Sequence, residues 1–285
     1  MRYMQMWIVT LAASTVVAGA ANPARAATDH TVAIWDMNET IGSRTMLDTG
    51  GRSLSGTIGR EVGVGTDVAG ARGYRFARLD PDTPPTHPQH LITVAASAGL
   101  DPGDADFAVT VRLRTTYQFG NVVQKGQSTV PGGNWKIQIP SGHPQCVFRG
   151  SNGTMLVAAP AAINDGGWHV VICLRAAGEL ALSIDGTRVA GRAGRTGRIS
   201  NTWPLSIGGK SSCDQVDVGC DYFAGDIDYV RIDSGDPDTT GQNGSGAGSP
   251  NGPHGDNPDT DGPDYGDSGW DEPDWGWPDF SGPGW

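Results

Sequence analysis

The stretch that decides the fold is Ile163-Asn164-Asp165-Gly166-Gly167-Trp168-His169-Val170-Val171-Ile172-Cys173-Leu174. Its first half is polar and rich in glycine, which suits the backbone angles of a tight turn. Its second half is apolar and rich in β-branched residues, which suits a buried, pleated strand. Trp168 is expected to anchor the core, and His169 is expected to lie at the core edge, bonded to backbone. A second strand is predicted at Glu179–Ile184, because apolar residues alternate there before an Asp185-Gly186 turn.

The clearest alternation in the chain lies at residues 106–114. One face of this predicted strand carries Phe107, Val109, Val111 and Leu113, and the other carries Thr110, Arg112 and Arg114. We expect the first face to be core and the second to be wet or to line a groove. Roughly a dozen such short strands can be traced, separated by turn residues, and no helical periodicity interrupts them. Gly63-Val64-Gly65 is interpreted as a turn, and the proline-rich residues 80–90 as a surface loop.

The net charge of −11 is confined to one end of the chain. Residues 234–285 contain ten aspartates, one glutamate, and no lysine or arginine, so the remainder is balanced. This segment also lacks Ile, Leu, Val and Met, and it is predicted to be disordered because it has little apolar surface to bury. Five aromatic residues are scattered near its end, so docking on a partner or a cell wall is the alternative to a plain linker. The chain has no excess of basic residues that would indicate nucleic-acid binding.

The N-terminus has the pattern of a secretory signal peptide. Arg2 is followed by an apolar run from Trp7 to Ala21 and by Ala24-Arg25-Ala26, an Ala-x-Ala site. We expect residues 1–26 to be the signal peptide, cleaved after Ala26, with Ala20 or Ala21 as alternative sites. An uncleaved anchor is the other interpretation, but the run is shorter than the ~20 residues of a membrane span. The mature chain is predicted to be secreted, with no transmembrane segment.

Four cysteines fit an oxidising compartment, and three pairings are possible. Cys213 and Cys220 are close in sequence and are predicted to staple one loop. Cys146 and Cys173 each lie in a predicted strand and are expected to form the second disulfide. A zinc site is the alternative, although the chain has neither a Cys-x-x-Cys motif nor paired histidines at ligand spacing.

The motifs together resemble the concanavalin A-like superfamily, in particular its laminin G-like bacterial members, over residues 30–233. Nine motifs occur in the expected order: Val32–Asp36 with Glu39, Asp48–Gly51, Phe107–Val109, Val122–Gly126, Trp135–Ile139, Asp165–Val171, Ile184–Gly186, Ile207–Gly209 and Phe223–Ile232. The resemblance implies an all-β, two-sheet antiparallel jelly-roll sandwich whose first and last strands lie together, here followed by the disordered tail 234–285. It also implies a frequent structural Ca²⁺ and a carbohydrate- or protein-binding role. Because this fold carries many activities, it does not fix the function.

No catalytic constellation is found, so we predict that the protein is not an enzyme. Glycosidases of this fold resemble one another in a Glu-x-Asp-x-x-Glu strand, which is absent here. Asp226-Ile227-Asp228 places two carboxylates on one side of a predicted strand. By the resemblance, however, these residues belong to the closing-strand motif of the family and not to a catalytic pair. Lyases of this fold share a Gln-x-His strand, and Gln138-Ile139-Pro140 breaks that pattern.

The expected function is carbohydrate binding by a secreted domain, with a polysaccharide or glycoconjugate as partner. A cell-surface protein-interaction or adhesion module is the first alternative, and a divergent glycan-active enzyme is the second. By resemblance, structural calcium is assigned to the loops of Glu39 and Asp48 together with Asp228. Sugar recognition calls for aromatic faces beside polar groups, and the candidates near strand ends are Tyr117, Lys125, Trp135 and Trp203.

Overall fold

The computed structural model describes residues 30–68, 71–79, 88–212 and 221–235. The chain divides into two compact units, Met1–Asn243 and Gly244–Trp285, and every described residue belongs to the first. The strands of the described residues are β1 His30–Trp35, β2 Thr45–Met46, β3 Gly56–Ile58, β4 Gly63–Val68, β5 Ala71–Phe76, β6 Ile92–Val94, β7 Phe107–Arg114, β8 Asn121–Lys125, β9 Asn134–Gln138, β10 Gln145–Gly150, β11 Gly153–Ala158, β12 His169–Ala176, β13 Glu179–Ile184, β14 Thr187–Ala193, β15 Leu205–Ile207 and β16 Gly225–Ser234. Three short 3₁₀ helices accompany them: η1 Pro88–His90, η2 Ala98–Leu100 and η3 Pro140–Gly142.

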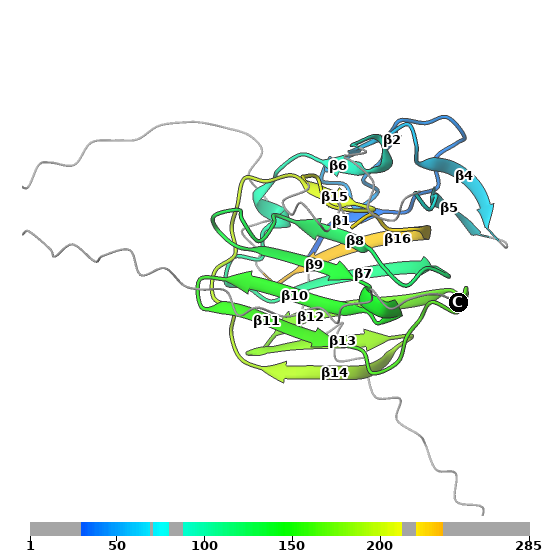
Figure 1. Cartoon of the computed structure of the whole chain (residues 1–285). Helices are drawn as coiled ribbons and strands as arrows, with labels where there is room; N and C mark the ends of the chain where they lie inside the picture. The colour runs from blue at the N-terminus through cyan, green and yellow to red at the C-terminus, as the bar shows by residue number, and fades with distance from the viewer. Residues whose placement is uncertain (1–29, 69–70, 80–87, 213–220, 236–285) are drawn as a thin grey trace, which may run out of the picture. The chain divides into compact units, whose positions relative to one another are not determined.

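The strands form two antiparallel sheets that pack face to face. The first sheet has the order β14-β13-β12-β7-β16-β5-β4, with β1 also paired to β16. The second has the order β11-β10-β9-β8-β15-β6-β3-β2. Figure 1 shows β9 and β10 of the second sheet lying over β7 and β12 of the first. The predicted all-β sandwich is confirmed.

Strand alternation places the core where the sequence predicts it. The inward row of β7, from Phe107 to Leu113, is fully buried, whereas Arg112 and Arg114 face outward and are partly exposed. Across the core, Phe107 contacts Trp135 of β9, with their ring centroids 5.6 Å apart. Strand β7 thus lies in the middle of the first sheet, and its apolar face packs against the second sheet.

The first and last strands of the domain pair with each other. In this antiparallel pairing His30 lies opposite Ser234 and Trp35 lies opposite Val230. Trp35 is fully buried, and its indole nitrogen donates to the Leu54 carbonyl at 2.7 Å. The expectations of a closed jelly-roll and of a core position for Trp35 are confirmed.

One disulfide joins the two sheets. Cys146 of β10 and Cys173 of β12 are bonded, with their Cα atoms 5.7 Å apart. This confirms the predicted Cys146–Cys173 pair and removes both residues from the zinc alternative. The predicted Cys213–Cys220 pair lies outside the described residues, as do the signal peptide 1–26 and nearly all of the tail 234–285.

Four strands contradict or escape the sequence interpretation: β2 and β3, which are only two and three residues long, and the longer β4 and β14. Gly63-Val64-Gly65 was expected to be a turn, but it begins strand β4, which pairs with β5 across a register shift at Gly63/Thr66. Glycine has no side chain, so the glycines of β4 add nothing to the alternation of apolar and polar side chains by which a strand is predicted. Strand β14 was not expected, since most of its side chains are exposed at a sheet edge. Among the described residues no helix has the length and hydropathy needed to cross a membrane.

Replacing both Cys146 and Cys173 by alanine should lower the free energy of unfolding by about 3 kcal/mol, because the disulfide closes a loop of 27 residues. Urea denaturation of the wild type and the double variant measures this difference. Equal midpoints in the two proteins would show that the cross-link between the sheets contributes nothing to stability.

Candidate functional site

A cluster of arginines and aspartates lies on the outer face of the first sheet. Asp226 of β16 is almost fully buried and is held by two arginines from neighbouring strands. Arg75 of β5 donates from Nε at 2.8 Å and from Nη2 at 3.2 Å, and Arg114 of β7 donates from Nε at 2.8 Å. Arg112 forms a second ion pair with Asp228. We call these five residues the arginine cluster.

Trp168 belongs to this outer face and not to the core. Its ring centroid lies 4.5 Å from the Arg112 guanidinium carbon and 5.2 Å from that of Arg114. The prediction that Trp168 anchors the core is therefore wrong. The reason is strand alternation: Val171 and Cys173 of β12 point inward, so Trp168 shares the outward parity of Val170. Cation–π contacts with arginine cover the ring there instead of apolar packing.

His169 also departs from its expected role at the core edge. Its ring lies between two carboxylates, with Nδ1 2.8 Å from Asp185 Oδ2 and Nε2 3.2 Å from Asp165 Oδ1. Partial burial acts to lower the pKa of His169, but the hydrogen bonds and charges of these aspartates outweigh it and raise the pKa. The histidine therefore links the Asp165 turn to the Asp185 turn of the next hairpin.

An open depression of about 730 Å³ lies beside the arginine cluster. Tyr117, which follows β7, forms part of its wall and is half-buried. The Arg78 guanidinium carbon lies 4.8 Å from the Tyr117 ring centroid, and Arg75 and Asp226 line the same depression. The Tyr117 depression thus brings an aromatic ring together with fixed charged donors and acceptors.

Two of the predicted ligand contacts are buried and cannot reach a ligand in this conformation. Trp135 is fully buried, and its indole nitrogen donates to the Leu100 carbonyl at 3.0 Å. Lys125 is also fully buried and lies at the end of β8, opposite Trp135. The prediction of a ligand role is wrong for both, because their strand positions face the opposite sheet.

Trp203 is half-buried and lies apart from the Tyr117 depression. Its indole nitrogen donates to Ser211 Oγ at 2.8 Å, and its backbone N–H donates to Asn201 Oδ1 at 2.9 Å. The four predicted ligand residues therefore do not form one site, and only Tyr117 lies in a depression with chemistry suited to a ligand.

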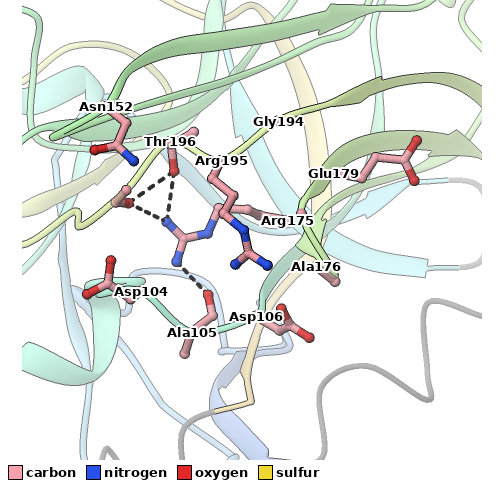
Figure 2. A pocket seen from close by; sticks show the side chains of 12 residues that line it. Asp104, Ala105, Asp106, Asn152, Arg175, Ala176, Glu179, Gly194, Arg195 and Thr196 are labelled. Atoms are coloured by element: carbon pink, nitrogen blue, oxygen red, sulfur yellow. Dashed lines mark hydrogen bonds between the residues drawn. The ribbon is translucent and has the colours of Figure 1, made fainter.

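A second cleft, of about 480 Å³, surrounds the buried Arg175 of β12. Figure 2 shows the Arg175 guanidinium directed between Thr196 and Ala105. It donates to Thr196 Oγ1 and to the carbonyls of Pro102, Gly103, Ala105 and Gly197 at 2.5–3.3 Å. Burial lowers the pKa of Arg175 to about 10. With its donors occupied, this arginine anchors the surrounding loops.

The cleft of Figure 2 offers poor chemistry for a sugar. Its rim carries both acidic and basic side chains, including Asp104, Glu179 and Arg195. None of the residues that line it is aromatic. A sugar ring stacks on a flat apolar face, so the Tyr117 depression is the better candidate of the two.

The three carboxylates assigned to calcium do not meet in one place. Asp48 Oδ1 accepts from the backbone N–H groups of Ile34 and Gly50, and Oδ2 accepts from those of Arg52 and Leu54. Glu39 accepts from Leu47 N and Tyr74 Oη, and Asp228 pairs with Arg112. The described residues hold no group of three His, Cys, Asp or Glu side chains arranged for a metal ion. This donor set does not fit a calcium ion, and calcium binding stays an untested prediction.

The sequence interpretation did not recognise the arginines as a site. The alternation at 106–114 did indicate that Arg112 and Arg114 share an outer face. It carried no information on which strands flank β7, and Asp226 and Arg75 reach the cluster from strands distant in sequence. The pairing partners of a strand were therefore the missing information.

Asp48→Asn should lower the free energy of unfolding by about 2 kcal/mol, because the amide nitrogen cannot accept the backbone N–H groups that the lost oxygen held. Asp36→Asn is the matched control, since Asp36 accepts from the Thr49 hydroxyl at the surface, and a smaller loss is expected. Both losses should be the same in EDTA. A loss that EDTA abolishes would instead indicate a calcium ion at Asp48.

The stabilisation by His169 should depend on pH. The raised pKa of His169 means that its contribution is complete below the ordinary histidine pKa of about 6.5 and disappears as the pH rises through the raised value. The pKa of Asp165 is lowered by the Gly167 N–H and by His169, so this contribution is also lost in acid, below the ordinary aspartate pKa of about 3.9. Wild type and His169→Gln should therefore differ most in stability between these limits.

Urea denaturation across this pH range tests the assignment, with Asp185→Asn as the reference background. His169→Gln should lower the free energy of unfolding less in the Asp185→Asn background than in the wild type, because one of the two carboxylate partners of His169 is already absent. A difference between wild type and His169→Gln that stays constant with pH would contradict a charged interaction.

The fold and motifs match a known family. The family model described as "Concanavalin A-like lectin/glucanases superfamily", of the laminin G group, matches residues 89–235, which is just over half of the chain. No curated protein matches this chain.

One solved structure shares the fold at low sequence identity, and others align less closely. The binding domain of Paraclostridial Mosquitocidal Protein 1 aligns with a TM-score of 0.51 at 12% identity, covering 72% of this chain and 48% of that chain. Domains LG4-5 of the mouse laminin alpha1 chain align with a TM-score of 0.40 at 16% identity, covering 57% and 47%. The binding domain of botulinum neurotoxin DC, solved in complex with SialylT, aligns with a TM-score of 0.48 at 12% identity, covering 72% and 47%. The chain spans about half the length of these structures. On the strength of the family match, this chain is a laminin G-like member of the concanavalin A-like lectin/glucanases superfamily.

Proposed function

We propose that this chain is a secreted, non-catalytic binding domain that takes carbohydrate, as part of a polysaccharide or glycoconjugate, in the Tyr117 depression. The observation that supports this most directly is the composition of the depression. An aromatic ring and a stacked Arg78 lie beside Arg75 and Asp226, in an open space of about 730 Å³. Stacking on an aromatic face and hydrogen bonds from fixed polar groups are the means by which proteins bind sugars.

The arginine cluster prepares the depression for hydroxyl groups. Asp226 is nearly buried and is held on both sides by guanidinium groups, so its neighbours keep their positions without a ligand. Arg75 remains about half exposed, with 49% of its side-chain surface accessible, and can donate to a ligand. A preorganised set of donors reduces the ordering that binding requires.

A binding role accounts for the two carboxylates of β16 better than a hydrolytic one. Hydrolysis of a glycoside uses one carboxyl as acid and a second as base or nucleophile across the scissile bond. Here Asp226 is engaged by Arg75 and Arg114, and Asp228 is engaged by Arg112. Both carboxylates are therefore occupied in positioning arginines.

A glycan array probed with the full mature chain tests the proposal, with binding constants for any hit measured by calorimetry. Tyr117→Ala should weaken binding by roughly 5- to 150-fold, because loss of the ring removes about 1–3 kcal/mol of stacking and apolar contact. Tyr117→Phe keeps the ring and should bind within a few-fold of the wild type. Arg198→Ala is the matched surface control, since Arg198 is exposed and lies outside the depression.

The same experiment separates the alternatives. Undiminished binding by Tyr117→Ala would place the site elsewhere, and an array without signal would favour a protein-interaction or adhesion module. A parallel assay for new reducing ends on polysaccharides should give none. Release of reducing ends that Asp226→Ala or Asp228→Ala abolishes would support a glycan-active enzyme. Running the array with Ca²⁺ and with EDTA tests the predicted calcium ion.

A further inference from the structure

A lysine, an aspartate and an asparagine meet inside the sandwich, away from the Tyr117 depression. Lys125 ends β8, Asp101 follows η2, and Asn201 lies in the segment before β15. Lys125 is fully buried, and Asp101 and Asn201 are 9% and 8% exposed. The proposed glycan site does not use any of the three.

The Lys125 nitrogen lies against both other side chains. Nζ donates to Asn201 Oδ1 at 2.9 Å and to the Asn201 backbone carbonyl at 2.8 Å. Asp101 Oδ1 lies 2.9 Å from the same nitrogen and forms an ion pair with it, so a proton can pass between the two groups. An amine is thus held against a side-chain amide with a carboxyl group beside it.

The Asn201 amide is held in one orientation beside the Lys125 nitrogen by two further hydrogen bonds. Its Nδ2 donates to the Gly133 carbonyl at 3.0 Å, and its Oδ1 accepts from the backbone N–H of Trp203 at 2.9 Å. The Trp203 N–H is placed where negative charge would develop on the oxygen, as in an oxyanion hole. Gly126 makes room for this amide, since a Cβ there would lie 2.7 Å from Asn201 Nδ2.

The surroundings favour uncharged forms of the lysine and the aspartate. Leu100, Trp135 and Leu205, which are all fully buried, adjoin Asp101 and Lys125 in the chain or in strand register. Burial lowers the pKa of Lys125 against the opposing effect of Asp101. Burial likewise raises the pKa of Asp101 against the effect of Lys125. A neutral amine is the nucleophilic form of lysine.

We propose that Lys125 and Asn201 join in a self-catalysed isopeptide bond, with Asp101 as the catalytic proton carrier. The Lys125 ammonium gives a proton to Asp101, and the free amine attacks Asn201 Cγ. Oδ1 carries the negative charge of the intermediate beside the Trp203 N–H. Asp101 moves a proton from Nζ to Nδ2, the Cγ–Nδ2 bond breaks, and the Nζ–Cγ amide remains. The reaction releases the Asn201 nitrogen as ammonium and needs no oxidant or added reactant.

The cross-link would tie the end of β8 to the segment before β15. It would act together with the Cys146–Cys173 disulfide, but unlike the disulfide it is insensitive to reducing agents. The three polar groups would otherwise form a buried ion pair, which contributes weakly to stability because both charges lose their hydration.

Mass spectrometry of the full mature chain, reduced and alkylated, tests the proposal directly. The wild type should be lighter than its sequence mass by one ammonia, and protease digestion should yield a branched peptide that joins the Lys125 and Asn201 segments. A wild-type mass equal to the sequence mass, with both segments released as linear peptides, would overturn the proposal and leave a buried ion pair only.

Asp101→Asn provides the mechanistic test, because it retains the shape of the side chain but cannot carry the proton. This variant should fold and regain the missing ammonia mass, and its reduced form should melt at a lower temperature than the reduced wild type. Lys210→Arg is the matched control: Lys210 forms another largely buried pair, with Asp221 at 2.8 Å, and the variant should keep the ammonia loss. Loss of ammonia that persists in Asp101→Asn would contradict the role of Asp101, and the same loss in Lys125→Arg would contradict the bond itself.

Discussion

The burial of the inner face of β7 is the constraint on which the rest of the structure depends. This strand pairs with β12 on one side and with β16 on the other, and its inward residues from Phe107 to Leu113 are fully buried. The same alternation turns Arg112 and Arg114 outward. A single strand thus fixes the centre of the core and supplies two members of the arginine cluster. Any slip in its register would exchange the two faces.

The interior of the domain contains charged groups that are satisfied in different ways. Arg175 gives its guanidinium hydrogens to one hydroxyl and four carbonyls, so it serves as an anchor for loops. Lys125 instead meets a carboxyl group and a side-chain amide, which can react with an amine. Buried polar groups need partners, and the chemistry of the partner decides whether the group only stabilises the fold or can react.

The outer face shows how a surface can be rigid and still suited to binding. Three ion pairs hold the arginines of the cluster, and Trp168 and Tyr117 each lie against a guanidinium group. Side chains that are braced by one another lose less freedom when a ligand arrives. The open depression beside these side chains lets a ligand reach the Tyr117 ring. The indole of Trp135 is fully buried, so a ligand cannot reach it.

The sequence by itself determined the local features of this protein. Alternation and turn residues predicted most strands, the inner face of β7 and the class of fold, because these signals act between residues that are close in the chain. The superfamily was predicted from the resemblance of nine ordered motifs to a known family. The Cys146–Cys173 pair was also predicted, although the residues alone allowed other pairings. Four strands were missed: β2 and β3 are too short to show a pattern, and neither the glycine-rich β4 nor the exposed β14 has an alternating apolar pattern. Only the tertiary structure decided that Lys125 and Trp135 are internal, that Trp168 is external, and that Asp226 joins arginines from two other strands. Those outcomes depend on which strands become neighbours and which face meets the opposite sheet, and these are contacts between residues far apart in the chain.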